Sequence, residues 1–231
     1  MNKIAVIIPV LNEESSIGKV LDDIPKKVNE IIVVDNGSKD NSAIIANNRN
    51  ATVLYEKRKG YGYACLKGIS YLKNKPPDIV VFLDGDYSDF PEELSNIVAP
   101  IEKGKVDFSL GARVKSLRET GSLTAQQIFG NALACVLMRL IYKSRFSDLG
   151  PFRAILWETL QSLEMQDKTY GWTVEMQLKI LKRKITYTEI PIHYRKRIGT
   201  SKVSGTLKGT IMAGYKILGW IGSFYFSRWK R

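Results

Sequence analysis

The chain has 231 residues, of which 44% are hydrophobic and 25% are charged, and its formal net charge is +12. A chain of this length can bury one substantial core, and its apolar content excludes disorder throughout. The positive charge is unevenly placed, because nine Lys and Arg residues but no acidic residue follow Glu189. Such a tail favours an anionic partner, which could be a phosphate, an acidic lipid or a nucleic acid.

The two cysteines, Cys65 and Cys135, lie in segments with helical periodicity. Neither has a CxxC partner or a histidine at metal-ligand spacing, so we expect both to be reduced, packed thiols. Residues 1–3 lead directly into a short strand, without the basic and then apolar pattern of a signal peptide. These features favour a cytoplasmic protein.

Three strand–helix units are predicted in the first part of the chain. Residues 4–8, 30–34 and 51–55 are short β-branched runs typical of buried strands, and the first is expected to end at Pro9. Apolar residues at helical spacing follow each run. The first turn has the sequence LNEES in place of a GxGxxG fingerprint, so the pattern does not favour a dinucleotide-dependent dehydrogenase.

The turn after the third strand, EKRKGYG, combines basic residues with glycines. Gly60 and Gly62 free the backbone at the start of the next helix, and the basic residues 57–59 precede them. This turn could approach an anionic ligand, but the glycine pair by itself favours a plain loop.

A fourth buried strand, residues 80–83, leads into three closely spaced acids, Asp84, Asp86 and Asp89. Ionised carboxylates are very costly in a low-dielectric interior, so we expect them at the carboxyl end of the strand, beside a cation. Closely spaced carboxylate oxygens suit a hard divalent ion such as Mg²⁺ or Mn²⁺. The alternative is a polar turn without a chemical role.

The alternation of strands and helices, with a fifth strand at residues 106–110, predicts an α/β fold. This pattern is typical of an open, mostly parallel, twisted sheet flanked by helices, with its site at the carboxyl ends of the strands. We divide the chain into a main domain at residues 1–205 and a basic, aromatic-rich C-terminal segment at residues 206–231.

The C-terminal segment has the pattern of an amphipathic helix. Residues 209–227 contain one charged residue, Lys216, together with Tyr215, Trp220 and Tyr225. Aromatic residues flanked by cations are typical of a helix at a membrane interface. Packing onto the main domain is one alternative, and a spanning helix is another.

Five motifs, IPVLNEE, VVDNGSKD, KGYGYACLKG, LDGD and GAR, occur in an order and spacing that resemble a family 2 glycosyltransferase of the GT-A fold. The later motifs SDLGPFRA, YGWTVEMQ and EIPIHYRKRIGTSKVSG are similar to the dolichol-phosphate mannosyltransferase, or polyprenyl-phosphate glycosyltransferase, branch. The resemblance implies that residues 1–205 are a catalytic domain. It further implies inverting transfer from a UDP- or GDP-sugar to a polyprenyl phosphate, with Mg²⁺ or Mn²⁺, by an enzyme peripheral to the inner face of the membrane.

The resemblance also implies roles for residues of this sequence. The nucleotide sugar would contact residues at the ends of four strands: Pro9, Leu11, Asn12, Glu13, Asp35, Asn36, Gly60, Asp84 and Gly85. The metal would be held by Asp84, Asp86 and Ser88, with Asp86 as its principal ligand. The acceptor phosphate would be bound by Arg113, Arg197, Ser201 and Lys202, and Arg118 would complete the catalytic, anion-binding wall.

The chemistry of the acceptor decides whether a general base is needed. A phosphate monoester has a second pKa of about 6, so its oxygen is already anionic and requires positioning, which the planar fork of arginine provides. A sugar hydroxyl would instead need a carboxylate base, for which Asp89, Asp148 and Glu175 are the candidates. That alternative corresponds to synthesis of an oligosaccharide, glycolipid or surface polysaccharide.

Several polar residues have both a structural and a functional interpretation. Asp148 and Arg153 form either a structural ion pair or a substrate contact, and Glu175 either faces solvent or lies near the acceptor. His193 has no partner histidine or cysteine, so we expect a structural role for it.

A basic nucleic-acid-binding module is a hypothesis from another class. It predicts interleaved aromatic and basic residues on an exposed face and steep salt dependence. Because it leaves Asp84 and Asp86 without a role, we expect no nucleic-acid partner.

Overall fold

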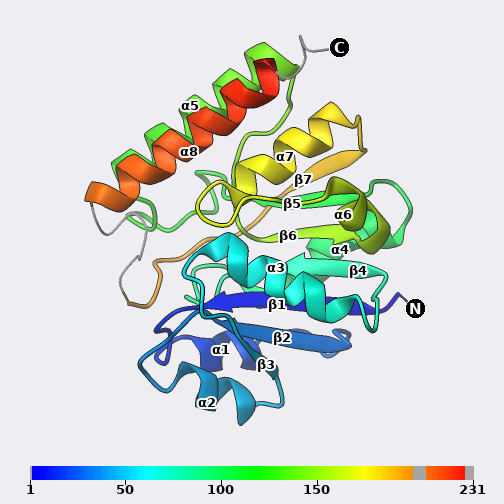
Figure 1. Ribbon diagram of the computed structural model, residues 1–231, viewed down its shortest axis with the longest axis vertical. Helices are drawn as coiled ribbons and strands as arrows, with labels where there is room; N and C mark the ends of the chain where they lie inside the picture. The colour runs from blue at the N-terminus through cyan, green and yellow to red at the C-terminus, as the bar shows by residue number, and fades with distance from the viewer. Residues whose placement is uncertain (1, 200–206, 227–231) are drawn as a thin grey trace.

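The computed structural model describes residues 2–199 and 207–226, which fold around one seven-stranded sheet (Figure 1). The strands are β1 Ile4–Val10, β2 Glu30–Asp35, β3 Thr52–Tyr55, β4 Ile79–Phe82, β5 Phe108–Ala112, β6 Arg153–Leu156 and β7 Tyr187–Pro191. Their order across the sheet is β3-β2-β1-β4-β6-β5-β7. The first βα units therefore form one half of the sheet, and the later strands form the other.

The sheet is mostly parallel, as predicted. The pairs β1–β2, β1–β4, β2–β3 and β5–β7 are parallel, whereas β6 is antiparallel to both β4 and β5. The reversed strand β6 was not predicted. Because β6 reverses the direction twice, β4 and β5 run the same way, and the carboxyl ends of β1, β2, β4 and β5 meet at one edge.

Helices cover both faces of the sheet. They are α1 Ile17–Asp22, α2 Ser42–Asn47, α3 Tyr61–Leu72, α4 Leu94–Glu102, α5 Ala125–Tyr142, α6 Trp157–Leu163, α7 Trp172–Lys182 and α8 Leu207–Phe226, with a 3₁₀ turn at Pro91–Glu93. The core on one face is made with α1, α2 and α4, and the core on the other with α3, α5, α6, α7 and α8. In β1, Ala5 and Ile7 face one core while Ile4, Val6 and Ile8 face the other, which is the period of two expected for a strand covered on both sides.

Two strands end later than the sequence predicted. β5 spans Phe108–Ala112 instead of residues 106–110, and β1 continues through Pro9. The carbonyl of Ile7 accepts a hydrogen bond from Leu83, so by alternation the main chain of Pro9 is also directed toward β4. β4 ends opposite Ile7, so no neighbouring strand requires the N–H that Pro9 lacks.

The C-terminal helix α8 packs on the main domain, against α5 and α7 (Figure 1). Ile221 is buried in the core, and its carbonyl accepts a 2.7 Å hydrogen bond from the hydroxyl of Tyr142. The indole Nε1 of Trp220 donates to Asp167 Oδ2 at 2.7 Å. Packing, one of the alternatives for this segment, is thus observed, and no helix in the described ranges is long and apolar enough to cross a bilayer.

Gly60 and Gly62 allow a second loop to approach the start of α3. The N–H of Tyr63 donates to the carbonyl of Lys168 at 3.1 Å. A Cβ on Gly62 would lie 2.1 Å from the carbonyl oxygen of Asp167, and one on Gly60 would lie 2.2 Å from that of Lys168. These glycines are therefore required by backbone packing, whether or not the turn also contacts a ligand. Cys65, in the same helix, is buried and unpaired, as is Cys135.

Gly62→Ala is expected to lower the free energy of unfolding by about 1–3 kcal/mol, because the new methyl group would displace the 167–168 backbone. Urea unfolding followed by circular dichroism measures this change as a lower midpoint. Gly222→Ala in α8 is the matched control, since its Cβ would meet no atom within 4 Å, and it should leave stability unchanged or raise it by up to about 1 kcal/mol. Equal midpoints for Gly62→Ala and wild type would contradict this account.

Candidate active site

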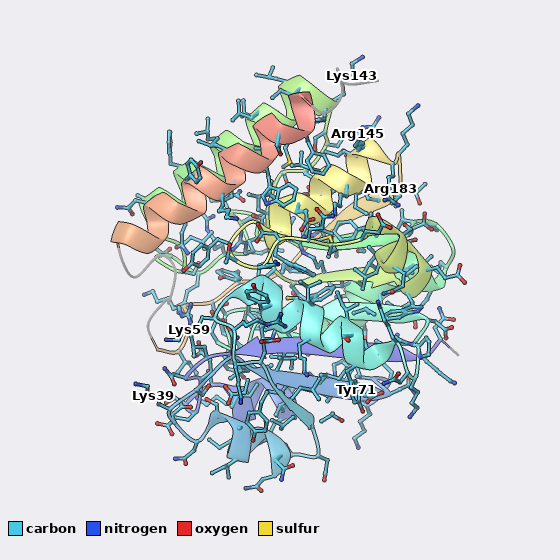
Figure 2. All side chains as sticks on the ribbon, viewed as in Figure 1. Lys39, Lys59, Tyr71, Lys143, Arg145 and Arg183 are labelled. Carbon is cyan, nitrogen blue, oxygen red and sulfur yellow. The ribbon has the colours of Figure 1, made fainter. Side chains whose placement is uncertain are left out.

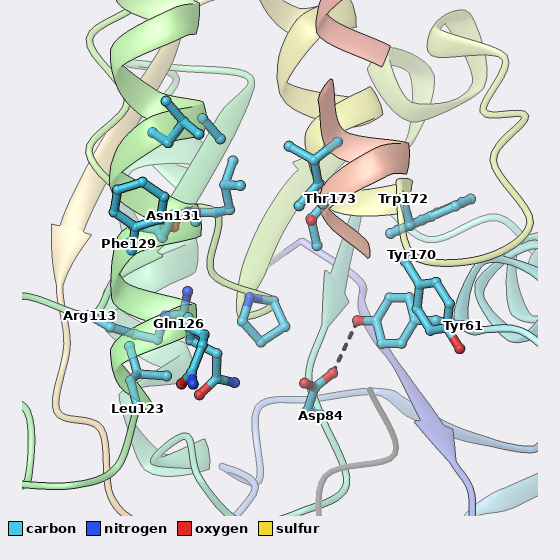
Figure 3. Close-up of a pocket in the computed structure, with 18 of the residues that line it drawn as sticks. Tyr61, Asp84, Arg113, Leu123, Gln126, Phe129, Asn131, Tyr170, Trp172 and Thr173 are labelled. Carbon is cyan, nitrogen blue, oxygen red and sulfur yellow. Dashed lines mark hydrogen bonds between the residues drawn. The ribbon is translucent and has the colours of Figure 1, made fainter. Parts of the chain in front are cut away.

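A cavity of about 580 Å³ opens at the carboxyl edge of the sheet. Its polar end is lined by Asp84, Asp86, Arg113 and Arg197, which follow β4, β5 and β7. From there it extends between α5, the start of α7 and α8 (Figure 3). The convergence of strand ends thus brings together two acids and two arginines that are far apart in the sequence.

Asp84 is held in a poorly solvated position beside a second acid. The hydroxyl of Tyr61 donates to Asp84 Oδ1 at 3.1 Å (Figure 3). Burial, and then the charge of Asp86, raise the pKa of Asp84 to about 7. Both effects penalise the ionised carboxylate, and a cation at this position would relieve them.

One carboxylate oxygen of Asp86 accepts hydrogen bonds, and the other forms an ion pair. Its Oδ1 accepts from the backbone N–H of Ser88 at 2.9 Å and from the Ser88 hydroxyl at 2.5 Å. Its Oδ2 lies 3.1 Å from Arg197 NH1, while NH2 of the same guanidinium lies 2.9 Å from Glu13 Oε1. Arg197 therefore bridges the turn after β1 and the turn after β4, and it supplies part of the positive charge that the acids require.

The donor set at this edge consists of oxygen atoms. Asp84 and Asp86 offer carboxylates, and Ser88 offers a hydroxyl that is already hydrogen-bonded to Asp86. Among residues 2–199 and 207–226, no group of three or more His, Cys, Asp or Glu side chains is arranged to hold a metal. The protein alone thus provides part of a coordination shell, of the hard oxygen type that suits Mg²⁺ or Mn²⁺.

The turns after β1, β2 and β3 are tied together by the residues predicted to contact the nucleotide. Asn36 donates to the carbonyls of Glu56 and Arg58, at 3.0 and 2.7 Å, and accepts from the N–H of Gly60 at 2.7 Å. Asn12, at φ 53°, accepts from the N–H of Lys39 at 2.8 Å. Side chains of Lys39 and Lys59 project at the same edge (Figure 2).

The other predicted donor residues also lie at this edge of the sheet. Asp35 closes β2 and accepts from the N–H of Ser38 at 2.8 Å. Pro9 is the second-to-last residue of β1, and Leu11 follows that strand. Gly85 lies close to the side chain of Val10. Their contacts with a nucleotide remain a prediction.

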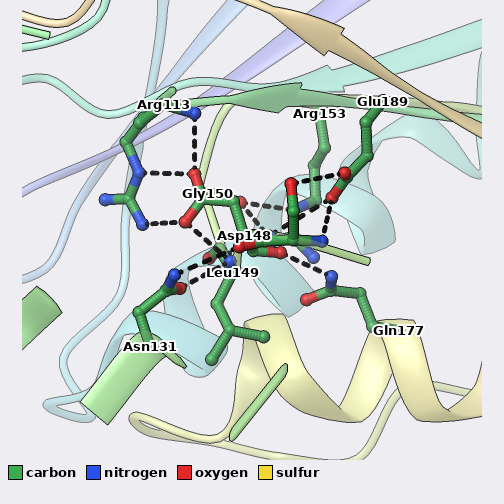
Figure 4. A network of polar contacts seen from close by, with 9 residues as sticks. Arg113, Asn131, Asp148, Leu149, Gly150, Arg153, Gln177 and Glu189 are labelled. Carbon is green, nitrogen blue, oxygen red and sulfur yellow. Dashed lines mark hydrogen bonds and ion pairs between the residues drawn. The ribbon is translucent and has the colours of Figure 1, made fainter. Parts of the chain in front are cut away.

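Arg113 forms a buried ion pair with Asp148 (Figure 4). Its Nε and NH2 donate to the two carboxylate oxygens at 2.7 Å each, and its backbone N–H donates at 2.9 Å. Burial alone would raise the pKa of Asp148, but the charge and hydrogen bonds of Arg113 outweigh it and hold this pKa below its usual range. Arg113 thus faces the cavity with its charge largely balanced.

A family model described as glycosyl transferase family 2 matches residues 5–172, which include most of β1, the acids after β4 and the Arg113–Asp148 pair. The chain belongs to the family 2 glycosyltransferases. The predicted family and the assignment as a glycosyltransferase are therefore confirmed.

Two relatives among known proteins show how far this similarity extends. A protein of Mycobacterium tuberculosis named as a glycosyltransferase is 32% identical over 213 residues, which cover 91% of this chain and 94% of that protein. A UDP-N-acetylglucosamine–dolichyl-phosphate N-acetylglucosaminyltransferase of Methanococcus voltae is 28% identical, over 93% of this chain and 92% of its own length. This family 2 glycosyltransferase thus aligns with both over nearly their whole lengths.

Solved structures share the fold. Glucosyl-3-phosphoglycerate synthase of Mycobacterium tuberculosis, in complex with Mn²⁺, uridine diphosphate and phosphoglyceric acid, superposes with a TM-score of 0.79. The alignment covers 97% of this chain and 78% of that one, at 22% identity. The GT-A fold predicted for the family 2 glycosyltransferase is therefore confirmed.

Two sequence-based interpretations need correction. Asp148 does not pair with Arg153, whose guanidinium instead donates to the carbonyls of Gly150, Leu149 and Thr173. Arg118 lines a separate surface hollow with His193 and not the cavity that contains Asp86. His193 itself pairs with Glu93, at 2.6 Å between Nδ1 and Oε1, which fits the structural role expected for it.

Glu175 neither faces solvent nor lines the cavity. Its side chain is fully buried, and its two oxygens accept from the backbone N–H groups of Gln166 and Asp167 at 2.8 Å each. Lys179 Nζ lies 2.7 Å from Oε1. Glu175 therefore holds the 164–171 loop in place, which does not fit the predicted role as a catalytic base.

Asp89 also lies outside the cavity lining. It is 2% exposed, and neither carboxylate oxygen has a hydrogen-bond partner in the described part of the chain. Burial, and then the charges of Asp84 and Asp86, raise the pKa of Asp89 well above its usual range. The structure thus gives this predicted catalytic acid no contact with the cavity. The predicted phosphate ligands Ser201 and Lys202 lie outside the described residues.

Several residues that shape the cavity were not predicted from the sequence. Tyr61 lies in the KGYGYACLKG motif, where only the glycines were considered, and its hydroxyl contacts Asp84. Tyr194, in the EIPIHYRKRIGTSKVSG motif, and Gln126, which lies in none of the motifs, also line the cavity. Trp172, in the YGWTVEMQ motif, forms part of the wall.

Glu175→Ala is expected to lower the free energy of unfolding by about 3 kcal/mol, because it leaves Lys179 and two backbone N–H groups without their buried partner. Urea unfolding measures the loss. The exposed Glu158, on α6, provides the control Glu158→Ala, for which a change within about 0.5 kcal/mol is expected. Wild-type stability with abolished activity would instead indicate a catalytic base.

The Arg113–Asp148 pair predicts a pH-dependent contribution to stability. Because the folded-state pKa of Asp148 is lowered, its contribution is fully present above the unfolded value of about 3.9 and is lost as pH falls through the folded value. The difference in unfolding free energy between wild type and Asp148→Asn should be about 3 kcal/mol at neutral pH and should shrink as the pH falls below the unfolded value of about 3.9. A difference that stays constant with pH would contradict this linkage.

Proposed function

We propose that this glycosyltransferase moves a sugar from a nucleotide-diphosphate sugar to the phosphate of a polyprenyl phosphate, with Mg²⁺ or Mn²⁺ as cofactor. The observation that carries the proposal is the composition of the cavity. It joins two acids and two arginines at one end to a long lining that includes Leu123, Phe129, Leu133, Ile217 and Leu218. Such a cavity suits an acceptor with an anionic head and an apolar chain.

The acidic end fits the donor and its metal. Asp84 and Asp86 would hold the ion, and Ser88 orients Asp86. The position of Asp86 already attracts a cation, since the guanidinium of Arg197 pairs with it. One guanidinium does not balance the charges of both Asp84 and Asp86, so a divalent cation fits between them. When bound, the ion would neutralise charge that develops on the leaving diphosphate. The Mn²⁺ and uridine diphosphate in the glucosyl-3-phosphoglycerate synthase complex support this assignment.

The absence of a suitable base among the cavity-lining residues favours a phosphate nucleophile. Within the described ranges, the carboxylates that line the cavity are Asp84 and Asp86, which are assigned to the metal. The three candidate bases lie elsewhere: Asp89 is buried outside it, Asp148 is paired with Arg113, and Glu175 holds a loop. An anionic phosphate oxygen needs no base, so Arg113 and Arg197 need only position it.

The comparisons are compatible with two phosphate acceptors. The Methanococcus voltae relative is named for dolichyl phosphate, whereas the glucosyl-3-phosphoglycerate synthase complex contains phosphoglyceric acid. The apolar lining between α5 and α8 favours the lipid, because a small, polar acceptor would leave that surface without a partner. A soluble, phosphate-bearing acceptor is the second candidate.

Asp86→Ala is expected to lower transfer by about 10²–10³-fold, because it removes the principal metal ligand. The assay follows release of nucleotide diphosphate from a panel of UDP- and GDP-sugars, with Mn²⁺ or Mg²⁺ and a short-chain polyprenyl phosphate. Asp78→Ala is the matched control, since Asp78 is exposed at the opposite, amino end of the same strand.

Release that requires both the metal and the lipid phosphate would support the proposal. Release that occurs with phosphoglycerate or a free sugar but not with the lipid phosphate would reject the lipid acceptor while leaving the transferase assignment intact. Full activity of Asp86→Ala would reject the metal site.

A further inference from the structure

The outer side of α5 is apolar although it faces solvent. Leu140 is 74% exposed, Phe129 70%, Val136 46% and Leu133 37%. These positions are separated by three or four residues, so they share one face of the helix. A solvent-facing helix surface is normally polar, and a contiguous apolar stripe of this kind marks an interaction site.

The neighbouring helix α8 extends this stripe. Tyr215 is 71% exposed and Leu218 is 45% exposed, and α8 packs beside α5 (Figure 1). We call the resulting surface the α5–α8 face, which consists of Ile128, Phe129, Leu133, Val136, Leu140, Tyr215 and Leu218.

The α5–α8 face is continuous with the cavity. Phe129, Leu133 and Leu218 are exposed on this face and also line the cavity that reaches Asp84 and Asp86. An apolar chain could therefore reach the cavity from the surface along these three side chains. A molecule bound on the α5–α8 face would therefore have direct access to the cavity.

The charges around the α5–α8 face are positive. No Asp or Glu occurs between Glu119 and Asp148 or anywhere after Glu189, so neither helix contains an acidic residue. Arg139 is exposed on α5, and the exposed Lys143 and Arg145 follow the end of this helix at the edge of the molecule (Figure 2). Cations beside an apolar face match the surface of an anionic bilayer.

The same charges disfavour a second copy of the chain as partner. In a symmetric dimer the same face meets itself, so the cations of the two copies would be brought together. Because α5 and α8 contain no acidic residue to pair with them, that contact would be repulsive.

We propose that the α5–α8 face docks on an anionic lipid bilayer and that the acceptor enters the cavity from the membrane across this face. The docking step does not depend on the proposed function, whereas the entry of the acceptor rests on it. In this proposal α5 makes the principal contacts with the bilayer. The C-terminal segment, for which the sequence predicted an interfacial position, contributes through α8.

The test uses the full chain and vesicles of phosphatidylcholine and phosphatidylglycerol at about 3:1. In Val136→Glu/Leu140→Glu, two exposed side chains that do not line the cavity become acidic. Co-sedimentation should show at least about tenfold weaker vesicle binding, because apolar contact is lost and repulsion is added. Tyr215→Glu, on α8, provides a second variant in case the double variant folds poorly.

Ile44→Glu is the matched control. Ile44 is 60% exposed on α2, which lies at the opposite end of the molecule from α5 and α8 (Figure 1). Its vesicle binding should equal that of wild type. The proposal would be overturned if the wild-type protein does not bind these vesicles. It would also be overturned if the face variants are folded and bind the vesicles as strongly as wild type. A wild-type dimer that dissociates in the face variants would assign the face to a second copy instead.

Activity measurements separate the docking step from the reaction. The face variants should keep wild-type turnover with a water-soluble, short-chain polyprenyl phosphate and lose at least about tenfold with a long-chain acceptor embedded in vesicles. Equal turnover of wild type and variants with the embedded acceptor would overturn entry across this face. Vesicle binding without transfer to any polyprenyl phosphate would leave docking in place and reject the proposed function.

Discussion

The candidate site depends on the cost of placing two carboxylates at the end of a fully buried strand. Each residue of β4 is buried, and Asp84 and Asp86 follow directly at the edge of the sheet. Water solvates these charges poorly, so the site requires a cation, and the raised pKa of Asp84 expresses the same requirement. Arg197 meets it in part by bridging Asp86 and Glu13. In the proposed reaction a divalent ion would supply more of the positive charge that Asp84 and Asp86 require. The same unfavourable electrostatics would therefore increase the affinity of the site for a metal ion and the diphosphate bound to it.

Several other buried polar groups are paired within the protein and support the loops. Asp148 fixes Arg113, Glu175 fixes the 164–171 loop, and Asn36 joins the turns after β2 and β3. Each of these groups uses its hydrogen-bonding capacity on neighbouring backbone or on a single ion-pair partner. The cavity therefore presents positioned cations and metal-binding oxygens with few groups for proton transfer, which is the arrangement that a phosphate nucleophile needs.

The helices α5 and α8 change what the fold can accept. The strand edge provides a polar site, and the two helices add an apolar wall that runs from this site to the solvent-facing surface. Tyr61 and Trp172 lie where the two regions meet. A cavity that is polar at one end and apolar at the other can hold an amphipathic molecule along its length. The positive charges around the apolar end favour contact with anionic lipid.

The sequence by itself determined the α/β class, the mostly parallel sheet and the position of the acids, because period-two burial and strand-end carboxylates are local patterns. It also contained the motifs that identify the family. Only the tertiary structure decided the direction of β6, the partner of Asp148 and the burial of Glu175, since each depends on residues distant in the chain. The apolar cavity was likewise beyond the sequence, because the apolar residues of α5 and α8 do not show by themselves which side of each helix meets the core. Long-range packing makes that choice, and it determines where the chemistry of the strand ends meets the surface.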